Sequence, residues 1–354
     1  MSILDIFNGD AFKSVTMDTA IRESGFVPNF LSGLNIFQEQ AIDTEGVAIE
    51  KMNGFLSVVP TTPRGSPAPQ YKKEKSNLRN FLSTRIAQGD RITASELNFL
   101  RRFGTEDQAE RAVGKVAERL GVTGSGTGIM TNLGLTLEHM MVNIIKTGKF
   151  IDKDGTVLVD WGNELRSDAQ IATNAVFSVP VVTFDFATLD NGDLREKLNQ
   201  VAREMVRSSK GLFTQETRIN VLVGDEFFDA LGKNAEIRNH HSRKENASWV
   251  EGANKWSVIS YAGFNFINYR GTDDNATVAV DLTKGHCFPV NTNGIFKHWY
   301  SHGESFDDLG QMGQFWYTDI VPDKDRDRYV DIDVAHYPLL GCTAPQVLRE
   351  FVLA

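Results

Sequence analysis

The chain has 354 residues, 41% of them hydrophobic and 23% charged, a composition that excludes a wholly disordered chain, a collagen and a disulfide-stapled mini-protein. Its length fits about two domains, or one large α/β body with insertions. The net charge of −9 makes the chain a poor candidate for gripping nucleic-acid phosphates, because that affinity comes from clustered cations.

Membrane segments and thiol chemistry are also disfavoured. No stretch approaches the ~18 apolar residues of a membrane helix, and the first residues lack a secretory signal, so we expect a protein that stays in the cytosol. The only two cysteines, Cys287 and Cys342, form no CxxC pair. They are therefore interpreted as two small buried side chains rather than a metal site or a disulfide.

The N-terminal part is irregular. Residues 1–48 show patchy apolar periodicity broken by glycines, which predicts an arm that packs on something rather than a self-contained unit. Residues 47–59 alternate as a strand does, with Asn53-Gly54 as a tight turn. Four prolines then fall within ten residues, which excludes this stretch from a central sheet or helix (Pro60, Pro63, Pro67, Pro69).

A basic segment from Pro60 to Thr93 stands out from the acidic remainder. It carries seven Lys and Arg residues against two acids. Folded back as a hairpin at ~3.3 Å per residue, it would reach roughly 50 Å, beyond a compact body whose radius of gyration is about 20 Å. We therefore expect this excursion to be mobile in the monomer or to lie on a neighbour, and we favour an acidic surface of a neighbour.

Helices are predicted after the basic segment. Two capping boxes, at 93–96 and 105–108, predict helices over 94–103 and up to residue 120. Apolar residues then recur every three or four positions from 129 to 145, which predicts a longer helix. A glycine ends each of the three helices (Gly104, Gly121, Gly148). Together they indicate a long, nearly collinear helical rod with a joint at the glycine-rich run 124–128.

The second half mixes strands and helices. FIDKDGTVLVD reads as a hairpin that turns at Asp154-Gly155, and VFSVPVVTF as a strand before an amphipathic helix over about 192–209. Residues 219–223 form a short buried strand, after which Asp225 is predicted to cap a short helix. Near the end, FWYTDIV and YVDIDVA are strands on either side of a charged turn, and the second strand has one buried and one wet face.

Candidate phosphate and calcium loops do not fit their motifs. The glycine run 124–128 lacks the lysine of a phosphate loop and follows a helix rather than a strand, so a helix joint is the better interpretation. Asp323, Asp325 and Asp327 have the 1-3-5 spacing of a calcium loop. Arg328 stands where that loop needs glycine, however, so we interpret the run as a solvated hairpin tip.

The remaining titratable groups also have ordinary interpretations. His298 and His302 lie four apart, as in a zinc helix, but their surroundings are not helical and no Glu stands beside the first. His240-His241 is interpreted as ordinary histidines, and Asp225-Glu226 as the start of a helix. No GxSxG elbow is present, so the sequence shows no active site and predicts neither a metal nor a cofactor.

Several ordered stretches resemble the lambda-type major capsid protein family (capsid E) of tailed bacteriophages. They cover nearly the whole chain, and the ordered set is more specific than any one of them: VAIEKMNGFLSVVPTTPRGSPAP, RITASELNFLRRFG, KTGKFIDKDGTVLVD, VLVGDEFFDAL, GFNFINYRG, GHCFPVNTNGIF and PLLGCTAPQVLREFV. The resemblance implies the α+β shell fold of tailed-phage and herpesvirus capsids. Its parts would be an N-terminal arm (1–48), an extended loop (49–93), a peripheral domain with a long spine helix (94–188 and 305–337) and an axial domain (189–304 and 338–354).

The resemblance also implies a function. Such chains self-assemble as hexamers and pentamers into an icosahedral phage head around double-stranded DNA, without sequence-specific DNA binding, enzyme activity or a cofactor. Assembly would take place in the host cytoplasm, with a portal, a separate scaffold and a decoration protein as further partners. We predict intersubunit contacts from the basic segment (Arg64, Lys72, Lys73, Lys75, Arg79).

Two alternatives stay open at this point. One is a cytosolic metal-dependent hydrolase that uses the Asp323 run or the pair His298/His302. The other is a nanocompartment shell of the same fold that encloses an enzyme rather than DNA.

Overall fold

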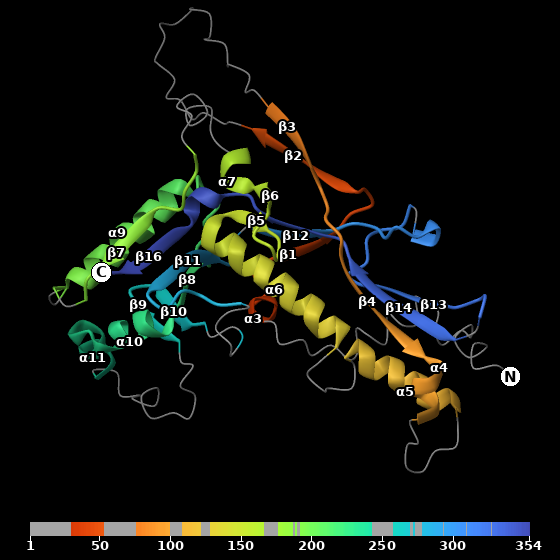
Figure 1. Cartoon of the computed structure of the whole chain (residues 1–354). Helices are drawn as coiled ribbons and strands as arrows, with labels where there is room; N and C mark the ends of the chain where they lie inside the picture. Colours follow the sequence, from red (N-terminus) through yellow and green to blue (C-terminus); the bar gives the residue numbers. More distant parts are fainter. Residues whose placement is uncertain are drawn as a thin grey trace, which may run out of the picture.

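The computed structural model describes residues 30–52, 76–99, 108–121, 128–165, 176–242 apart from 187, 190 and 191, and 258–354 apart from 270, 271, 273–277, 293, 309 and 327. Figure 1 shows a large sheet with its helices at one end of the molecule and a smaller sheet at the other. One long helix, α6 (Ile129–Thr147), runs from the first toward the second.

The larger sheet has six strands in the order β7-β16-β11-β8-β10-β9. At its centre β8 pairs antiparallel with β11 and parallel with β10. The side chains of residues 219–223 in β8 are all buried, which confirms the predicted buried strand. The strands are β7 (Val181–Phe184), β8 (Arg218–Val223), β9 (Ile259–Tyr261), β10 (Phe264–Asn268), β11 (Lys284–Val290) and β16 (Arg349–Leu353).

Three helices belong to this end of the molecule: α9 (Asp193–Ser208), α10 (Asp225–Lys233) and α11 (Ala235–Ser242). The first confirms the amphipathic helix expected over 192–209. Its buried side chains recur every three or four residues, so one face of the helix packs on the core (Leu194, Leu198, Val201, Met205).

The predicted cap of α10 is wrong by one residue. The N-cap is Gly224, whose carbonyl accepts a hydrogen bond from the N–H of Phe228 at 3.0 Å. Asp225 is the first helical residue, and its carboxylate accepts from the Asn268 side chain at 2.8 Å. A Cβ at position 224 would lie 2.3 Å from the carbonyl oxygen of Asp281, so this close backbone approach requires glycine where the helix starts.

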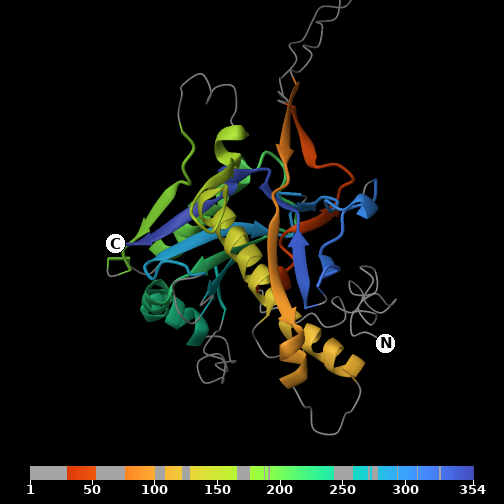
Figure 2. The same ribbon diagram turned by 45° about the vertical axis from the view of Figure 1, so that its right-hand side comes forward.

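Three helices are present where the helical rod was expected, and residues 122–127 of the expected joint lie outside the described residues. α5 (Gln108–Leu120) ends at Gly121 and α6 ends at Gly148, both with positive φ. Figures 1 and 2 both show α5 beyond the N-terminal end of α6. α4 (Ala94–Phe99) begins where predicted, while its expected continuation to residue 103 lies outside the described residues.

The smaller sheet consists of three antiparallel strands, β13 (Tyr317–Pro322), β14 (Tyr329–His336) and β4 (Ile86–Thr93). The predicted alternation in β14 is confirmed, because Val330, Ile332 and Val334 are buried. They pack with apolar residues of β4, α5 and the first turns of α6.

The pairing of β4 corrects one expectation. The basic segment is not a single excursion to Thr93, because all eight residues of β4 pair with β14 of the same chain. The projecting part ends before Ile86. The proposed domain boundaries themselves stay predictions.

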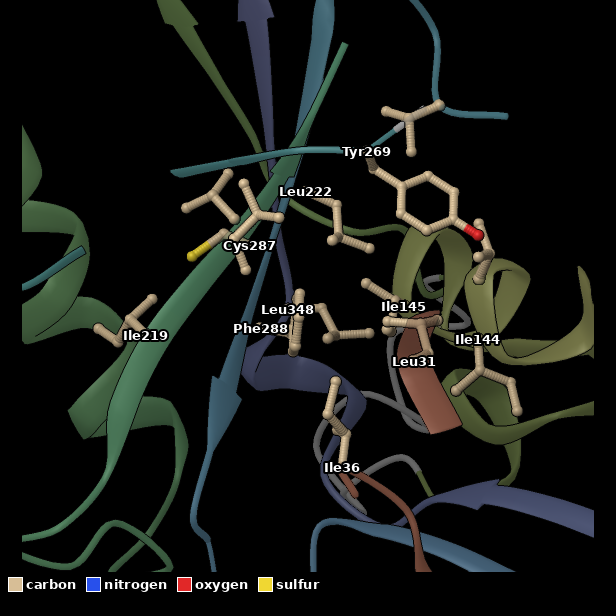
Figure 3. Close-up of a cluster of buried hydrophobic side chains, with 14 of the residues drawn as sticks. Leu31, Ile36, Ile144, Ile145, Ile219, Leu222, Tyr269, Cys287, Phe288 and Leu348 are labelled. Atoms are coloured by element: carbon tan, nitrogen blue, oxygen red, sulfur yellow. The ribbon is translucent and has the colours of Figure 1, made fainter. Parts of the chain in front are cut away.

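A third sheet joins the N-terminal segment to the rest of the chain. It has the order β1-β12-β15, with β1 (Gln38–Ala41) parallel to β12 (Phe296–Tyr300) and β12 antiparallel to β15 (Pro338–Cys342). Figure 3 shows Leu31, from the short helix α3 (Phe30–Gly33), and Ile36 among the buried side chains of the large hydrophobic core. Residues 30–41 of the expected arm therefore pack on their own subunit, and residues 1–29 lie outside the described residues.

Smaller elements complete the fold. The predicted hairpin of β5 (Lys149–Ile151) and β6 (Val157–Asp160) is confirmed, with Gly155 at φ +81° in its turn. It leads into α7 (Trp161–Glu164), whose Trp161 is fully buried. Two 3₁₀ turns are η2 (Phe306–Asp308) and η3 (Pro345–Val347).

The helix joint gives a first prediction. A Cβ at Gly128 would lie 2.4 Å from the Cα of Gly121, whereas a Cβ at Gly232 in α10 meets no atom within 4 Å. We expect Gly128→Ala to lower the free energy of unfolding by about 1–3 kcal/mol through overpacking.

The matched variant Gly232→Ala should raise that free energy by about 0.5–1 kcal/mol, because alanine loses less entropy in a helix. Urea unfolding of both purified variants measures the difference. Equal effects of the two substitutions would contradict the close contact between the two glycines.

Candidate interaction surfaces

The β2–β3 hairpin is the most prominent projection of the described chain. β2 (Gly46–Met52) pairs antiparallel with β3 (Ser76–Leu82), from Gly46 opposite Leu82 to Met52 opposite Ser76. Both views show this ribbon reaching away from the six-stranded sheet and from the sheet of β13, β14 and β4 (Figures 1 and 2). The Asn53-Gly54 turn lies outside the described residues.

The two faces of this hairpin differ because successive side chains of a strand point to opposite sides. On the inner face, Phe81 is buried against Trp161, with ring centroids 4.7 Å apart. Arg79 on the same face forms an ion pair with Glu164 at the end of α7. These contacts fix the hairpin to its own subunit.

The outer face exposes two leucines. Leu78 is 63% exposed and Leu82 68% exposed. Burying a leucine side chain stabilises a structure by about 1.5–3 kcal/mol, and within the described chain this gain is not realised at either position. A projecting ribbon with two exposed leucines on one face is suited to packing against another molecule.

The described cations of the basic segment pair within the chain. Arg85 lies 3.6 Å from Glu304, and the Arg91 guanidinium donates two hydrogen bonds to Asp331, at 2.6 and 2.9 Å. With the Arg79–Glu164 pair, three cations of the segment have carboxylate partners in their own subunit. The predicted contact residues Arg64, Lys72, Lys73 and Lys75 lie outside the described residues.

The histidines of the suspected zinc pair do not face each other. His298 in β12 lies with its Nε2 3.0 Å from the Nε2 of His336 in β14. His302 contacts the carbonyl oxygen of Gly303 through Nδ1, at 2.8 Å. Sequence reasoning missed His336 because it is 38 residues away, in a strand that pairs with β13 and β4 rather than with β12.

The His298–His336 pair is buried in aromatic surroundings. Phe315, Trp316 and Tyr300 pack around it, with ring centroids 4.7–6.2 Å from that of His336. Burial lowers the pKa of His298 to about 3. Burial, and then repulsion from His298, holds the pKa of His336 well below its usual value. Both imidazoles are therefore neutral in the folded protein.

The aspartate run forms a turn, as predicted. Asp323 accepts hydrogen bonds from the N–H groups of Asp325 and Arg326, at 3.1 and 3.3 Å, which closes the hairpin tip. Asp327 lies outside the described residues. Within the described ranges, His, Cys, Asp and Glu side chains nowhere gather as three that could hold a metal ion.

The cysteines are free and buried, as expected. Burial raises the pKa of Cys342 to about 12 and raises that of Cys287 further, so neither is a thiolate at neutral pH. In the described part of the chain, no helix combines the length and apolar character needed to cross a membrane.

One surface hollow of about 380 Å³ lies where β4 meets α5 and α6. Arg119 in its lining lies 3.2 Å from Asp90, also in the lining, and 3.6 Å from the nearby Glu96. The described residues that line it include no histidine, cysteine, serine or threonine: Gln88, Gly89, Asp90, Glu118, Arg119, Gly128, Ile129 and Asn132. This hollow therefore does not support the hydrolase alternative.

The chain is similar to known proteins both in sequence and in fold. A sequence model of the family described as phage major capsid protein E matches residues 13–353. The major capsid protein of Salmonella phage Felix O1 (isolate Felix O1-VT1) is 23% identical over 358 residues, covering 92% of each chain.

Solved structures agree at the level of the fold. The bacteriophage PhiM1 mature capsid gives a TM-score of 0.55 at 12% identity, covering 93% of this chain and 89% of that one. The putative capsid protein of a prophage of E. coli CFT073 gives 0.54 at 14% identity, covering 100% and 99%. The capsid of cyanophage P-SCSP1u gives 0.51 at 9% identity, covering 90% and 86%. These matches confirm the expected α+β capsid shell fold.

The buried histidine pair gives a second prediction. Below pH about 6.5 the unfolded chain binds protons that the folded chain excludes, so stability should fall as the pH drops from 6.5 toward 3. The double variant His298→Phe/His336→Phe removes both partners together and so leaves no unpaired imidazole.

We expect the variant to lose less stability than the parent chain between pH 7 and pH 5, by about 2 kcal/mol for each histidine. Urea unfolding of the soluble chain at the two pH values measures this difference. Parallel losses in the two proteins would show that the pair is not neutral when folded.

Proposed function

Because this chain belongs to the phage major capsid protein E family and is a phage major capsid protein, we propose that its copies join as hexamers and pentamers in the icosahedral head shell. The main support for this arrangement of subunits is the β2–β3 hairpin. One face of the hairpin is fixed to its own subunit, and the other face exposes Leu78 and Leu82. The hairpin would lie across a neighbouring subunit and bury these leucines there.

The basic segment would extend this contact. Arg64, Lys72, Lys73 and Lys75 supply four cations beyond the described hairpin strands, against a chain of net charge −9. Arg79 would contribute at the root of the same contact while it keeps its pair with Glu164. Attraction between this segment and acidic groups of a neighbour would orient the hairpin as subunits meet.

The two ends of the molecule would have separate places in the shell. The smaller sheet with α4, α5 and α6 would form the peripheral domain, and the six-stranded sheet with α9, α10 and α11 would form the axial domain. Under this division β7, expected in the peripheral domain, would belong to the axial domain, and residues 30–41 of the arm and β4 would be attached to the subunit's own sheets.

Further partners belong to the same proposal. The shell would enclose double-stranded DNA without sequence-specific contacts, since an acidic chain neither grips phosphates nor hinders their packing. A portal, a scaffold and a decoration protein would complete the head, which would assemble in the host cytoplasm. The chain would act as a structural protein rather than an enzyme, with no cofactor.

Expression of the chain alone tests this proposal. We expect closed shells, tubes or rings of subunits in negative-stain electron microscopy, with matching sedimentation, and no loss of particles in EDTA. A chain that stays monomeric even when coexpressed with the scaffold of its own phage would contradict the proposal. Stoichiometric metal in the purified chain, together with activity lost in EDTA, would revive the hydrolase alternative.

The exposed leucines give a separate prediction. Leu78→Ser/Leu82→Ser should leave the subunit folded, because both side chains already contact solvent, and should reduce the yield of particles at least tenfold. Leu282→Ser, at a position 45% exposed near β11, is the matched control and should assemble normally. Sedimentation and thermal unfolding measure the two properties. Full assembly of the double variant would show that the outer face of the hairpin is not buried in the shell.

A further inference from the structure

The chain crosses directly from the smaller sheet to the sheet of β1, β12 and β15. β14 ends at His336 and β15 begins at Pro338, so a single residue separates strands of two different sheets. The His298–His336 pair lies at this junction, with one imidazole on β12 and the other on the last residue of β14. Besides α6, the junction is therefore a second connection between the two ends of the subunit.

The buried apolar side chains form separate clusters on the two sides of the junction. Among the described residues, β12 and β15 contribute to the large core, whereas β14 contributes to the cluster of the smaller sheet. The imidazole pair lies between them, and the ring centroid of Phe315 is 5.4 Å from that of His298 and 4.7 Å from that of His336. Separation of the two imidazoles would thus leave the packing of both clusters intact.

The contact between the imidazoles requires both of them to be neutral. One Nε2 carries a proton and donates it, and the other Nε2 accepts it through its lone pair at 3.0 Å. A further proton would occupy that lone pair, so that two N–H groups would face each other and the hydrogen bond would be lost. The added charge would also lie among buried aromatic rings. Protonation and the closed junction therefore exclude each other.

The surroundings of the pair do not stabilise a protonated imidazole. The charged and titratable groups on the strands and loops next to it are Glu39, Arg85, His302, Glu304, Asp319 and Asp333. Arg85 pairs with Glu304, and Asp333 points to the other face of β14 from His336 because the two positions differ by an odd number. Burial lowers the pKa of both histidines, and repulsion from His298 lowers that of His336 further, while none of the six groups acts on either pKa.

We infer that the His298–His336 pair is an acid-sensitive clasp between the smaller sheet and the sheet of β1, β12 and β15. Protonation of either imidazole separates β12 from the end of β14 while both apolar clusters stay packed. The subunit then remains folded, but its two ends are held together mainly by α6 and can change their relative position. In a shell, where these ends would have separate places, the clasp would determine how firmly each subunit keeps its shape.

The size of the acid effect follows from the two states of each histidine. An imidazole in contact with water has a pKa of about 6.5, whereas the pKa of the clasped His298 is about 3. At pH 5 an exposed imidazole is protonated by about 30 to 1, so the release of one histidine raises the ratio of open to closed junctions about 30-fold over its value in neutral solution. Release of both histidines raises this ratio about 1,000-fold.

Hydrogen–deuterium exchange of the full soluble chain tests the clasp. Two N–H groups report on the junction, since that of Ser301 donates to the Tyr337 carbonyl at 3.1 Å and that of Thr84 donates to the Pro338 carbonyl at 3.0 Å. After correction for the intrinsic effect of pH on exchange, we expect their protection to fall about 100-fold or more between pH 7.5 and pH 5. The amides of β8 should stay protected at both pH values, because the local opening does not reach the centre of the six-stranded sheet.

Two variants connect the acid response to the pair. His298→Phe/His336→Phe keeps two rings in the junction but removes their titrating nitrogens, so it should lose most of the pH dependence. His302→Gln is the matched control, because it removes a histidine from the adjoining loop that contacts the Gly303 carbonyl instead of the pair. It should keep the full acid response.

Three results would overturn the clasp. They are an acid response that persists in the double variant, an acid response that disappears in the His302→Gln control, and a loss of protection in β8 equal to that at the junction. The last result would show that acid unfolds the whole subunit rather than the junction.

Proton NMR of the imidazole Cε1–H groups provides a test that needs no variant. His298 and His336 should stay neutral as long as the junction amides are protected and should titrate only as this protection is lost. Titration of either histidine near pH 6.5 with the junction still protected would contradict the clasp. Both measurements use single subunits, so a failure of the clasp leaves the proposed assembly standing.

Discussion

The fold depends on one helix that is buried at both ends in different cores. Ile129, Met130 and Leu133 of α6 pack in the cluster of the smaller sheet, whereas Met140 to Ile145 belong to the large core of the six-stranded sheet. Midway, Glu138 is 2% exposed and accepts hydrogen bonds from the Leu31 N–H at 3.0 Å and the Tyr269 hydroxyl at 2.9 Å. An unpaired carboxylate at this depth would be costly, so these partners hold the N-terminal segment and the end of β10 against the helix. The two ends of the subunit thus behave as one framework.

The surface proposed for assembly lies outside this framework and is attached to it by specific contacts. Phe81 and the Arg79–Glu164 pair attach the β2–β3 hairpin. The exposed groups therefore have fixed positions although they add nothing to the core. This arrangement separates two roles: the buried side chains pack the cores of the subunit, and the projecting side chains are exposed for contact with other copies.

Local pattern was sufficient to predict elements whose buried side chains recur with a regular period. The period of α6, the alternation of Val330 to Val334 in β14 and the glycine ends at Gly121 and Gly148 were all confirmed, because each depends on neighbours within a few residues. Features set by distant pairing could not be predicted in this way. The eight pairs between β4 and β14 join residues more than 230 positions apart, so the basic segment gave no sign that its last residues belong to a sheet. The cap at Gly224 depends on the approach of Asp281, and the partner of His298 is His336. The sequence does not distinguish the exposed Phe306 from a buried aromatic residue, because side chains in a loop follow no periodic pattern of burial.

The balance of charge affects how copies of this subunit approach one another. At a net charge of −9, copies repel one another at long range, which opposes contacts made without the correct geometry. Each proposed contact is modest, since a buried leucine contributes about 1.5–3 kcal/mol and an exposed ion pair at most about 1 kcal/mol. A pair of subunits joined by one such contact would therefore separate readily. In a closed ring, every subunit both gives and receives the same contact, and the last subunit binds two neighbours at once at a high effective concentration. Stability then comes from closure rather than from any single interface, as a shell built from many copies of one chain requires.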